Sequence, residues 1–327
     1  MDPQLAAGNT SQHLQELPLD ESLAFVFPVQ GSQKVGMGND VRAASAVARE
    51  VFAIADDAVG FALASLCADG PDDELTRTEN AQPAILTASL AVLAAALESG
   101  AITARPAFVA GHSLGEYTAL VAAGSLDITD AVRLVRERGR LMGASTDGTM
   151  AAVIGVDEAT VAAICSESGA EVANYNGPTQ TVVGGSHEAV ERACALARER
   201  GGRGLPVNVS GAFHTSLMEP AAREFAKTLD AAAIDMPQIT VIANVSAQPI
   251  TTVDRVRAEL SRQIGAPVRW YQSMNWLEAN GVRRVMEIGG KTLTAQLKRS
   301  NPNLECIAVD EAAALGRAAR TGEASNV

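Results

Sequence analysis

Residues 107–116 read AFVAGHSLGE, and this stretch decides the fold of the chain. An apolar run typical of a buried strand leads to Ser113 between two glycines, and a run suited to a helix follows over residues 114–123. This order is typical of a nucleophile elbow, a sharp turn from strand to helix that exposes the serine Oγ and favours glycine beside it. Backbone N–H groups at the start of the helix would stabilise an oxyanion formed there. The same residues also fit a serine that only caps a helix, so a catalytic interpretation requires a base elsewhere.

The composition is that of a globular protein. The chain has 327 residues, of which 47% are hydrophobic and 20% charged, enough for one large domain and a smaller one. The net charge of −12 argues against nucleic acid or a membrane surface as the main partner. The strongly apolar residues 85–97 are too few to span a bilayer and predict a buried helix. The four cysteines are widely spaced, which predicts free thiols in the cytoplasm and no metal site.

Strand and helix patterns alternate in the first half of the chain, which predicts an α/β fold. A strand over residues 23–29 ends in a loop of small and amide residues, and helical patterns cover residues 40–66 and 81–98. A further amphipathic helix is expected over residues 127–142. Strands that alternate with helices form a parallel sheet, and the elbow makes the expected large domain α/β-hydrolase-like.

The pattern changes at residue 148. Short strands and helices then follow in the order βαββαβ, which predicts a small ferredoxin-like subdomain over residues 148–208. We interpret this unit as an insertion, so that the large catalytic domain is discontinuous and comprises residues 22–147 and 209–316. The terminal segments, residues 1–21 and 317–327, are expected to be disordered.

The base can be sought by elimination, because a serine nucleophile is most often activated by a histidine and the chain has only four. His13 lies in the N-terminal extension, and His187 begins a surface helix. His112 neighbours Ser113 in the chain, so its side chain should point elsewhere. His214 remains, where the chain leaves the small unit and a cleft between domains is expected. No acidic partner is evident, so a carbonyl or amide would orient the imidazole and make a dyad.

Four motifs, taken in order, resemble one known family. They are the loop QGSQ over residues 30–33, the elbow, the arginine-rich residues 136–140, and Ala212-Phe213-His214. Together they make the chain similar, over residues 23–309, to the malonyl-CoA:acyl-carrier-protein transacylases of fatty-acid synthesis. The resemblance implies a ping-pong reaction without a resident cofactor. Ser113 would take the malonyl group from malonyl-CoA and pass it to the phosphopantetheine thiol of an acyl carrier protein, with His214 as base and then acid.

The resemblance also assigns groups around the serine. Backbone N–H groups of Gln30 and Leu114 would form the oxyanion hole. Arg138 would hold the malonyl carboxylate, which a planar guanidinium grips through two parallel hydrogen bonds. From spacing alone, Arg138 would be one more solvated arginine on its helix. One position departs from the family pattern, because Val29 stands where a glycine usually precedes the loop glutamine, and its branched side chain would crowd the loop.

Three amide side chains complete the implied pocket. Gln263 matches the family residue that helps to orient the histidine, and Gln82 and Asn176 match residues that line the pocket. An acidic carrier protein would dock on a local basic face, either the helix over residues 133–140 or the segment over residues 291–299.

Two other functions stay open. A stand-alone, trans-acting acyltransferase of a polyketide synthase would share every catalytic residue. An acyl-thioester hydrolase would pass the acyl group to water, but a buried cation at Arg138 has no purpose for a neutral ester.

Overall fold

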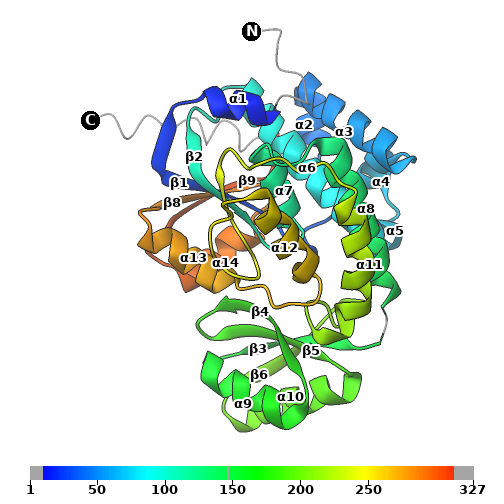
Figure 1. The fold of residues 1–327 in the computed structure, drawn as a ribbon, viewed down its shortest axis with the longest axis vertical. Helices are drawn as coiled ribbons and strands as arrows, with labels where there is room; N and C mark the ends of the chain where they lie inside the picture. The colour runs from blue at the N-terminus through cyan, green and yellow to red at the C-terminus, as the bar shows by residue number, and fades with distance from the viewer. Residues whose placement is uncertain (1–9, 146, 313–327) are drawn as a thin grey trace.

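A parallel five-stranded sheet forms the centre of the larger part of the protein (Figure 1). The computed structural model describes residues 10–145 and 147–312. The strand order is β7-β2-β1-β8-β9, and every pair is parallel. The strands are β1 (Leu19–Phe27), β2 (Arg105–Gly111), β7 (Thr240–Ile242), β8 (Arg284–Ile288) and β9 (Glu305–Val309). The expected α/β fold with a parallel sheet is confirmed.

Helices cover both faces of this sheet, because successive side chains of a strand point to opposite sides. In β1, Phe25 and Phe27 join the main hydrophobic cluster, whereas Ala24 and Val26 join a second cluster with α13 and α14. The helices of this part are α1 (Thr10–Glu16), α2 (Asn39–Ala44), α3 (Ala46–Val59), α4 (Leu63–Asp69), α5 (Asp72–Thr76), α6 (Thr78–Glu98), α7 (Gly115–Ala122), α8 (Ile128–Ala144), α11 (Glu219–Asp230), α12 (Val253–Gln263), α13 (Trp270–Ala279) and α14 (Thr292–Ser300).

The helix α6 runs through the main core. Its length and mean hydropathy of 1.5 would suffice to cross a membrane, but its whole apolar window is buried inside the protein. The core therefore accounts for its apolar character, and the buried helix predicted at residues 85–97 is confirmed.

A second, four-stranded antiparallel sheet lies below the larger part in Figure 1, with the order β4-β5-β3-β6. Its elements are β3 (Thr149–Ile154), α9 (Glu158–Ser168), β4 (Glu171–Gly177), β5 (Gln180–Gly185), α10 (His187–Glu199) and β6 (Arg203–Val207). The two helices pack together and cover one face of the sheet, where they enclose a separate hydrophobic cluster. This part therefore has a hydrophobic core of its own.

The prediction of a disordered segment over residues 1–21 is wrong for the residues from Thr10 onward. They form α1 and the start of β1, and the side chain of Leu14 is fully buried in the main core. Arg105 also donates a hydrogen bond to Gln15 Oε1 at 2.8 Å. A short polar helix is ordered by such tertiary contacts and not by its own propensity. Residues 1–9 and the tail predicted over residues 317–327 lie outside the described residues.

The helical pattern over residues 40–66 forms three helices instead of one. Ser45 ends α2, and its side chain then accepts a hydrogen bond from the Ala48 backbone N–H, which caps α3. Gly60, with φ 77°, ends α3 in the left-handed conformation.

Candidate active site

Ser113 lies at the sharp turn between β2 and α7, as the sequence predicts. Its φ is 53°, in the left-handed region that side chains rarely adopt. A Cβ on Gly111 would lie 1.9 Å from the carbonyl carbon of Gly115. A Cβ on Gly115 would lie 2.3 Å from the carbonyl oxygen of Phe27. Gly111 is therefore required for the turn itself, and Gly115 for the packing of the turn against β1.

Asn244, just beyond β7, fastens the turn. The Ser113 backbone N–H donates to Asn244 Oδ1 at 2.6 Å, and Asn244 Nδ2 donates to the Gly111 carbonyl oxygen at 2.7 Å. Sequence reasoning missed this residue. No local sequence pattern marks it, because its place depends on the parallel pairing of β7 with β2, which brings the carboxyl ends of the two strands to one edge.

His214 is the base partner of the serine. Its Nε2 atom lies 2.7 Å from Ser113 Oγ, and its Nδ1 atom lies 2.8 Å from the Gln263 carbonyl oxygen. With a proton on Nδ1, the imidazole donates to the carbonyl, and Nε2 is free to accept the serine proton. Burial and, to a smaller extent, the charge of Arg138 lower the pKa of His214 to about 3. The imidazole is therefore neutral at physiological pH, as a base must be.

Arg138 enters the site from α8, and its side chain is only 1% exposed. Nη2 donates to Ser113 Oγ at 3.0 Å and to Gln263 Oε1 at 2.9 Å, and Nη1 donates to Gln82 Oε1 at 2.8 Å. The guanidinium also lies over the Tyr117 ring, 5.5 Å from its centre. Its hydrogen-bond partners in the described part of the chain are neutral oxygens, so a buried positive charge lies beside the nucleophile without a bonded carboxylate.

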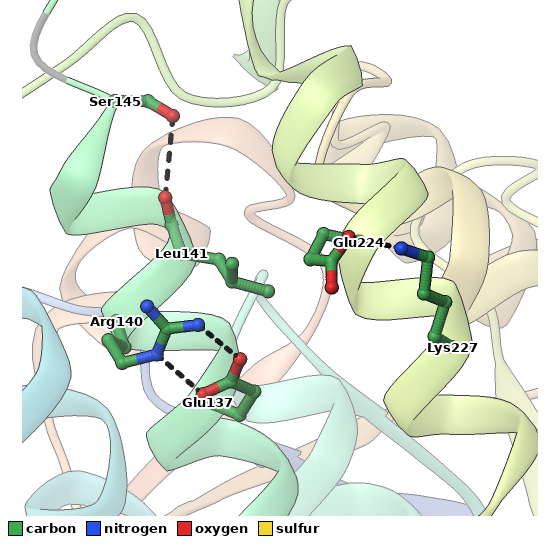
Figure 2. A network of polar contacts seen from close by, with 6 residues as sticks. All are labelled: Glu137, Arg140, Leu141, Ser145, Glu224 and Lys227. Carbon is green, nitrogen blue, oxygen red and sulfur yellow. Dashed lines mark hydrogen bonds and ion pairs between the residues drawn. The ribbon is translucent and has the colours of Figure 1, made fainter.

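The other arginines of α8 lie elsewhere. Arg136 donates to the Glu79 carbonyl oxygen and lies over the Phe61 ring. Arg140 forms two hydrogen bonds with Glu137 on the outer surface, at 2.7 and 2.6 Å (Figure 2). Of this arginine cluster, Arg138 is thus the member that contacts the serine, as the resemblance implied.

Gln82 and Asn176, the two amides predicted to line the pocket, make different contacts. Gln82 connects Arg138 to the loop after β1, because its Nε2 atom lies 3.5 Å from Gln30 Oε1. Asn176 instead contacts His112, with Oδ1 and Nε2 2.8 Å apart. Asn176 therefore contacts the elbow at His112, the residue before Ser113.

His112 packs beside the elbow, as expected for a histidine that is not the base. Its ring centre lies 5.5 Å from that of Trp270. Burial lowers the pKa of His112 to about 4, so this side chain is also neutral at physiological pH.

Leu114 follows the serine in the turn, and Gln30 lies in the loop after β1. Within residues 10–145 and 147–312, neither backbone N–H group donates to a protein oxygen, so both are available to an oxyanion. Val29 packs against the second hydrophobic cluster, and it is not among the described non-glycine residues with positive φ, which are Ser113, His214 and Ala247.

A cavity of about 810 Å³ opens next to the site. Its walls come from the loop at Gln30, from α5 and α6, from the end of α8, and from residues 207–210, which connect the small sheet to the larger part. Gln30 connects the cavity to the site, and residues 207–210 place it beside the connection between the two parts.

Comparison with known proteins identifies the family. Residues 24–320 match the model of the acyl transferase domain. The chain belongs to the acyl transferase domain family. This acyltransferase is 43% identical over 314 residues to the malonyl CoA-acyl carrier protein transacylase of Bacillus subtilis (strain 168), a match covering 93% of this chain and 98% of the relative.

Solved structures resemble the acyltransferase closely. An acyl carrier protein S-malonyltransferase from Vibrio cholerae has a TM-score of 0.88 and 41% identity, and the match covers 91% of this chain and 99% of that one. A malonyl-transacylase in complex with its type II polyketide synthase acyl-carrier protein has a TM-score of 0.88 and 38% identity, with 92% and 100% covered.

Proposed function

We propose that this acyltransferase transfers the malonyl group from malonyl-CoA to the phosphopantetheine thiol of an acyl carrier protein through a malonyl-Ser113 intermediate. The observation that carries the proposal is Arg138, a buried cation whose Nη2 atom lies 3.0 Å from Ser113 Oγ. In a dry site, a guanidinium favours an acyl group with its own carboxylate over a neutral one. The related proteins of Bacillus subtilis and Vibrio cholerae, both named as malonyl transferases, support the same substrate.

In the first half-reaction, Ser113 Oγ attacks the thioester carbonyl carbon of malonyl-CoA while His214 Nε2 takes the hydroxyl proton. The N–H groups of Gln30 and Leu114 stabilise the oxyanion of the tetrahedral intermediate. As the carbon–sulfur bond breaks, His214 returns the proton to the leaving sulfur, and free coenzyme A departs. The malonyl group remains as an ester on Ser113, with its carboxylate on Arg138.

In the second half-reaction, the phosphopantetheine thiol gives its proton to His214 Nε2, and its sulfur attacks the ester carbonyl carbon. The ester bond breaks, and His214 protonates Ser113 Oγ. The Gln263 carbonyl oxygen keeps the imidazole in the same tautomer throughout. Groups of the chain perform every step, so the proposed reaction needs no resident metal or cofactor.

The cavity between the two parts is the proposed entry for the pantetheine arm, which coenzyme A and a carrier protein share. For docking of an acidic carrier, the α8 surface is less suitable than its composition indicates. Figure 2 shows Arg140 paired with Glu137, and a Glu224–Lys227 pair opposite on α11. On the second basic face, Lys291 pairs with Asp310 at 3.1 Å. Lys298 and Arg299 at the end of α14 are therefore the proposed docking cations.

The second candidate function is that of a stand-alone acyltransferase that supplies a polyketide synthase. It is favoured by one observation, the likeness to a malonyl-transacylase bound to a type II polyketide synthase carrier protein. Both candidates use the same reaction at Ser113, so the carrier protein alone distinguishes them.

We further propose a classification of the two parts. The elbow after β2 supports an α/β-hydrolase-like domain made of residues 22–147 and 209–316. The element order from β3 to β6 supports a ferredoxin-like subdomain over residues 148–208. The four cysteines are free thiols, which supports a cytoplasmic location.

Radiolabelled malonyl-CoA tests the proposed function. The label should appear on Ser113, and the Ser113→Ala protein should not acquire it. Added carrier protein should then receive the label, and fatty-acid and polyketide carriers assayed side by side should differ in rate. Labelling of Ser113→Ala would exclude this nucleophile. Release of malonate to water, with the carrier left unacylated, would instead support an acyl-thioester hydrolase.

A further inference from the structure

A buried carboxyl group lies under the elbow, and no step of the proposed reaction uses it. Glu116, in the first turn of α7, is fully buried. Its Oε1 atom accepts a hydrogen bond from the Asn244 backbone N–H at 3.1 Å, and its Oε2 atom accepts one from Gln263 Nε2. Burial raises the pKa of Glu116 to about 8, although the hydrogen bonds from Asn244 and Gln263 favour the ionised form that accepts at both oxygens.

The side-chain amide of Gln263 is fully engaged in the site. Nε2 donates to Glu116 Oε2 and to the Ser113 carbonyl oxygen at 3.0 Å, and Oε1 accepts from Arg138 Nη2 at 2.9 Å. A primary amide has two donor hydrogens and one acceptor oxygen. Because two oxygens receive both hydrogens, the amide oxygen must face the guanidinium. The backbone of the same residue orients His214.

We propose that Glu116 is a positioning residue of the acyl-transfer site, whose two carboxyl oxygens hold the Gln263 amide in the one orientation that directs Arg138 at the acyl group bound to Ser113. Glu116 touches neither substrate nor the reacting atoms. Its effect on selectivity passes through Gln263 to Arg138, and this effect rests on the proposed malonyl transfer. The orientation of the Gln263 amide does not depend on that proposal.

A glutamine at position 116 would break the arrangement although its shape is the same. The Asn244 N–H requires the amide oxygen, so the new NH₂ group would face Gln263 Nε2, and two donors would meet. Rotation of the Gln263 amide would relieve this clash. It would then turn Nε2 toward Arg138 and the amide oxygen toward the Ser113 carbonyl oxygen, so Arg138 would lose its aligned partner.

Glu116→Gln is the test, and Glu287→Gln is its matched control. Glu287 is another fully buried carboxyl group, which accepts hydrogen bonds from the backbone N–H groups of Leu293 and Thr294 at 3.2 and 2.7 Å. We expect Glu116→Gln to lower the ratio of kcat/KM for malonyl-CoA to that for acetyl-CoA by about tenfold to hundredfold, with a higher KM for malonyl-CoA. Glu287→Gln should keep the wild-type ratio. Glu116→Asp retains both acceptor oxygens and should recover part of it.

A wild-type ratio in Glu116→Gln, or an equal fall in both glutamine variants, would overturn the proposal. A crystal structure of substrate-free Glu116→Gln gives a second readout that is independent of the acyl donor. Because a rotated amide would face the guanidinium with a second donor, we expect a longer Arg138–Gln263 contact or a displaced Arg138 guanidinium, and an unchanged contact would also overturn it. If the wild type fails to load malonyl, the proposed function fails, while this structure still decides the role of Glu116. If Glu116→Gln does not fold, Glu116→Ala supplies both measurements, because it removes both acceptor oxygens from the Gln263 amide and the Asn244 N–H.

Discussion

The Nη2 atom of Arg138 donates a hydrogen bond to Oγ of Ser113, so the proposed carboxylate-binding group touches the nucleophile. We expect Arg138→Ala to lose about a hundredfold or more in kcat/KM for malonyl-CoA, because a charge-assisted pair is removed. Acetyl-CoA, which has no carboxylate, should lose far less. Initial rates with both donors measure this difference.

Two variants sharpen that experiment. Arg138→Lys keeps the charge but not the planar fork, so its selectivity should fall between those of the wild type and alanine. Arg133→Ala removes an arginine of the same helix that is exposed and 3.9 Å from Asp130, and it should behave as wild type. Equal losses for malonyl-CoA and acetyl-CoA in Arg138→Ala would exclude the carboxylate clamp.

The pH dependence should reflect the buried imidazole of His214. Its pKa is lowered from 6.5 to about 3, so the neutral base persists in the free enzyme as the pH falls. We therefore expect His214 to contribute no acid limb to kcat/KM between about pH 8 and pH 6, because its own limb lies below that range. An acid limb centred near 6.5 would contradict the assignment of His214.

The free energy of unfolding should also fall at acidic pH. The pKa values of His214 and His112 are both lowered on folding, to about 3 and about 4, so the unfolded chain binds these protons first. Their contribution to the free energy of unfolding is present above the unfolded value of 6.5 and is lost as the pH falls toward the folded values. Denaturant titrations at several pH values, with His112→Asn compared with wild type, measure this slope.

Asn244 should be as important to the elbow as its glycines. Asn244→Ala leaves the Ser113 N–H and the Gly111 carbonyl oxygen without their partner, which should cost about 1–3 kcal/mol of stability and slow acylation of Ser113. Asn244→Asp keeps the acceptor for Ser113 and should retain more activity. Denaturant unfolding and single-turnover acylation measure the two effects. An alanine variant with normal acylation would show that the turn holds its shape unaided.

The N-terminal helix α1 should contribute to stability but not to chemistry. Leu14→Ala empties a fully buried position, which should lower the free energy of unfolding by about 2–5 kcal/mol. Leu19→Ala, at a side chain 49% exposed, should change it by no more than about 0.5 kcal/mol. Both proteins should acylate Ser113 normally when folded. Equal stabilities would mean that α1 does not hold the core.

The sequence allowed the elbow and the base to be predicted because both depend on local pattern or on a short list of candidates. The turn at Ser113 follows from its glycines and flanking runs, and His214 was the remaining histidine. Asn244 and Glu116 could not be predicted in the same way. Their roles arise from hydrogen bonds between residues more than a hundred positions apart, which leave no local signal. The helix α1 was not predicted for a similar reason, because a single leucine in a polar run gives no hydrophobic periodicity.

The charge of Arg138 has a consequence for the timing of proton transfer. It is one of the causes that lower the pKa of His214, and a substrate carboxylate that pairs with the guanidinium would offset it. The imidazole would then become a stronger base at the moment when malonyl is seated, whereas an acetyl group would leave it weak. The same arginine would therefore both bind the malonyl carboxylate and, once paired with it, raise the basicity of the His214 imidazole that transfers the malonyl group.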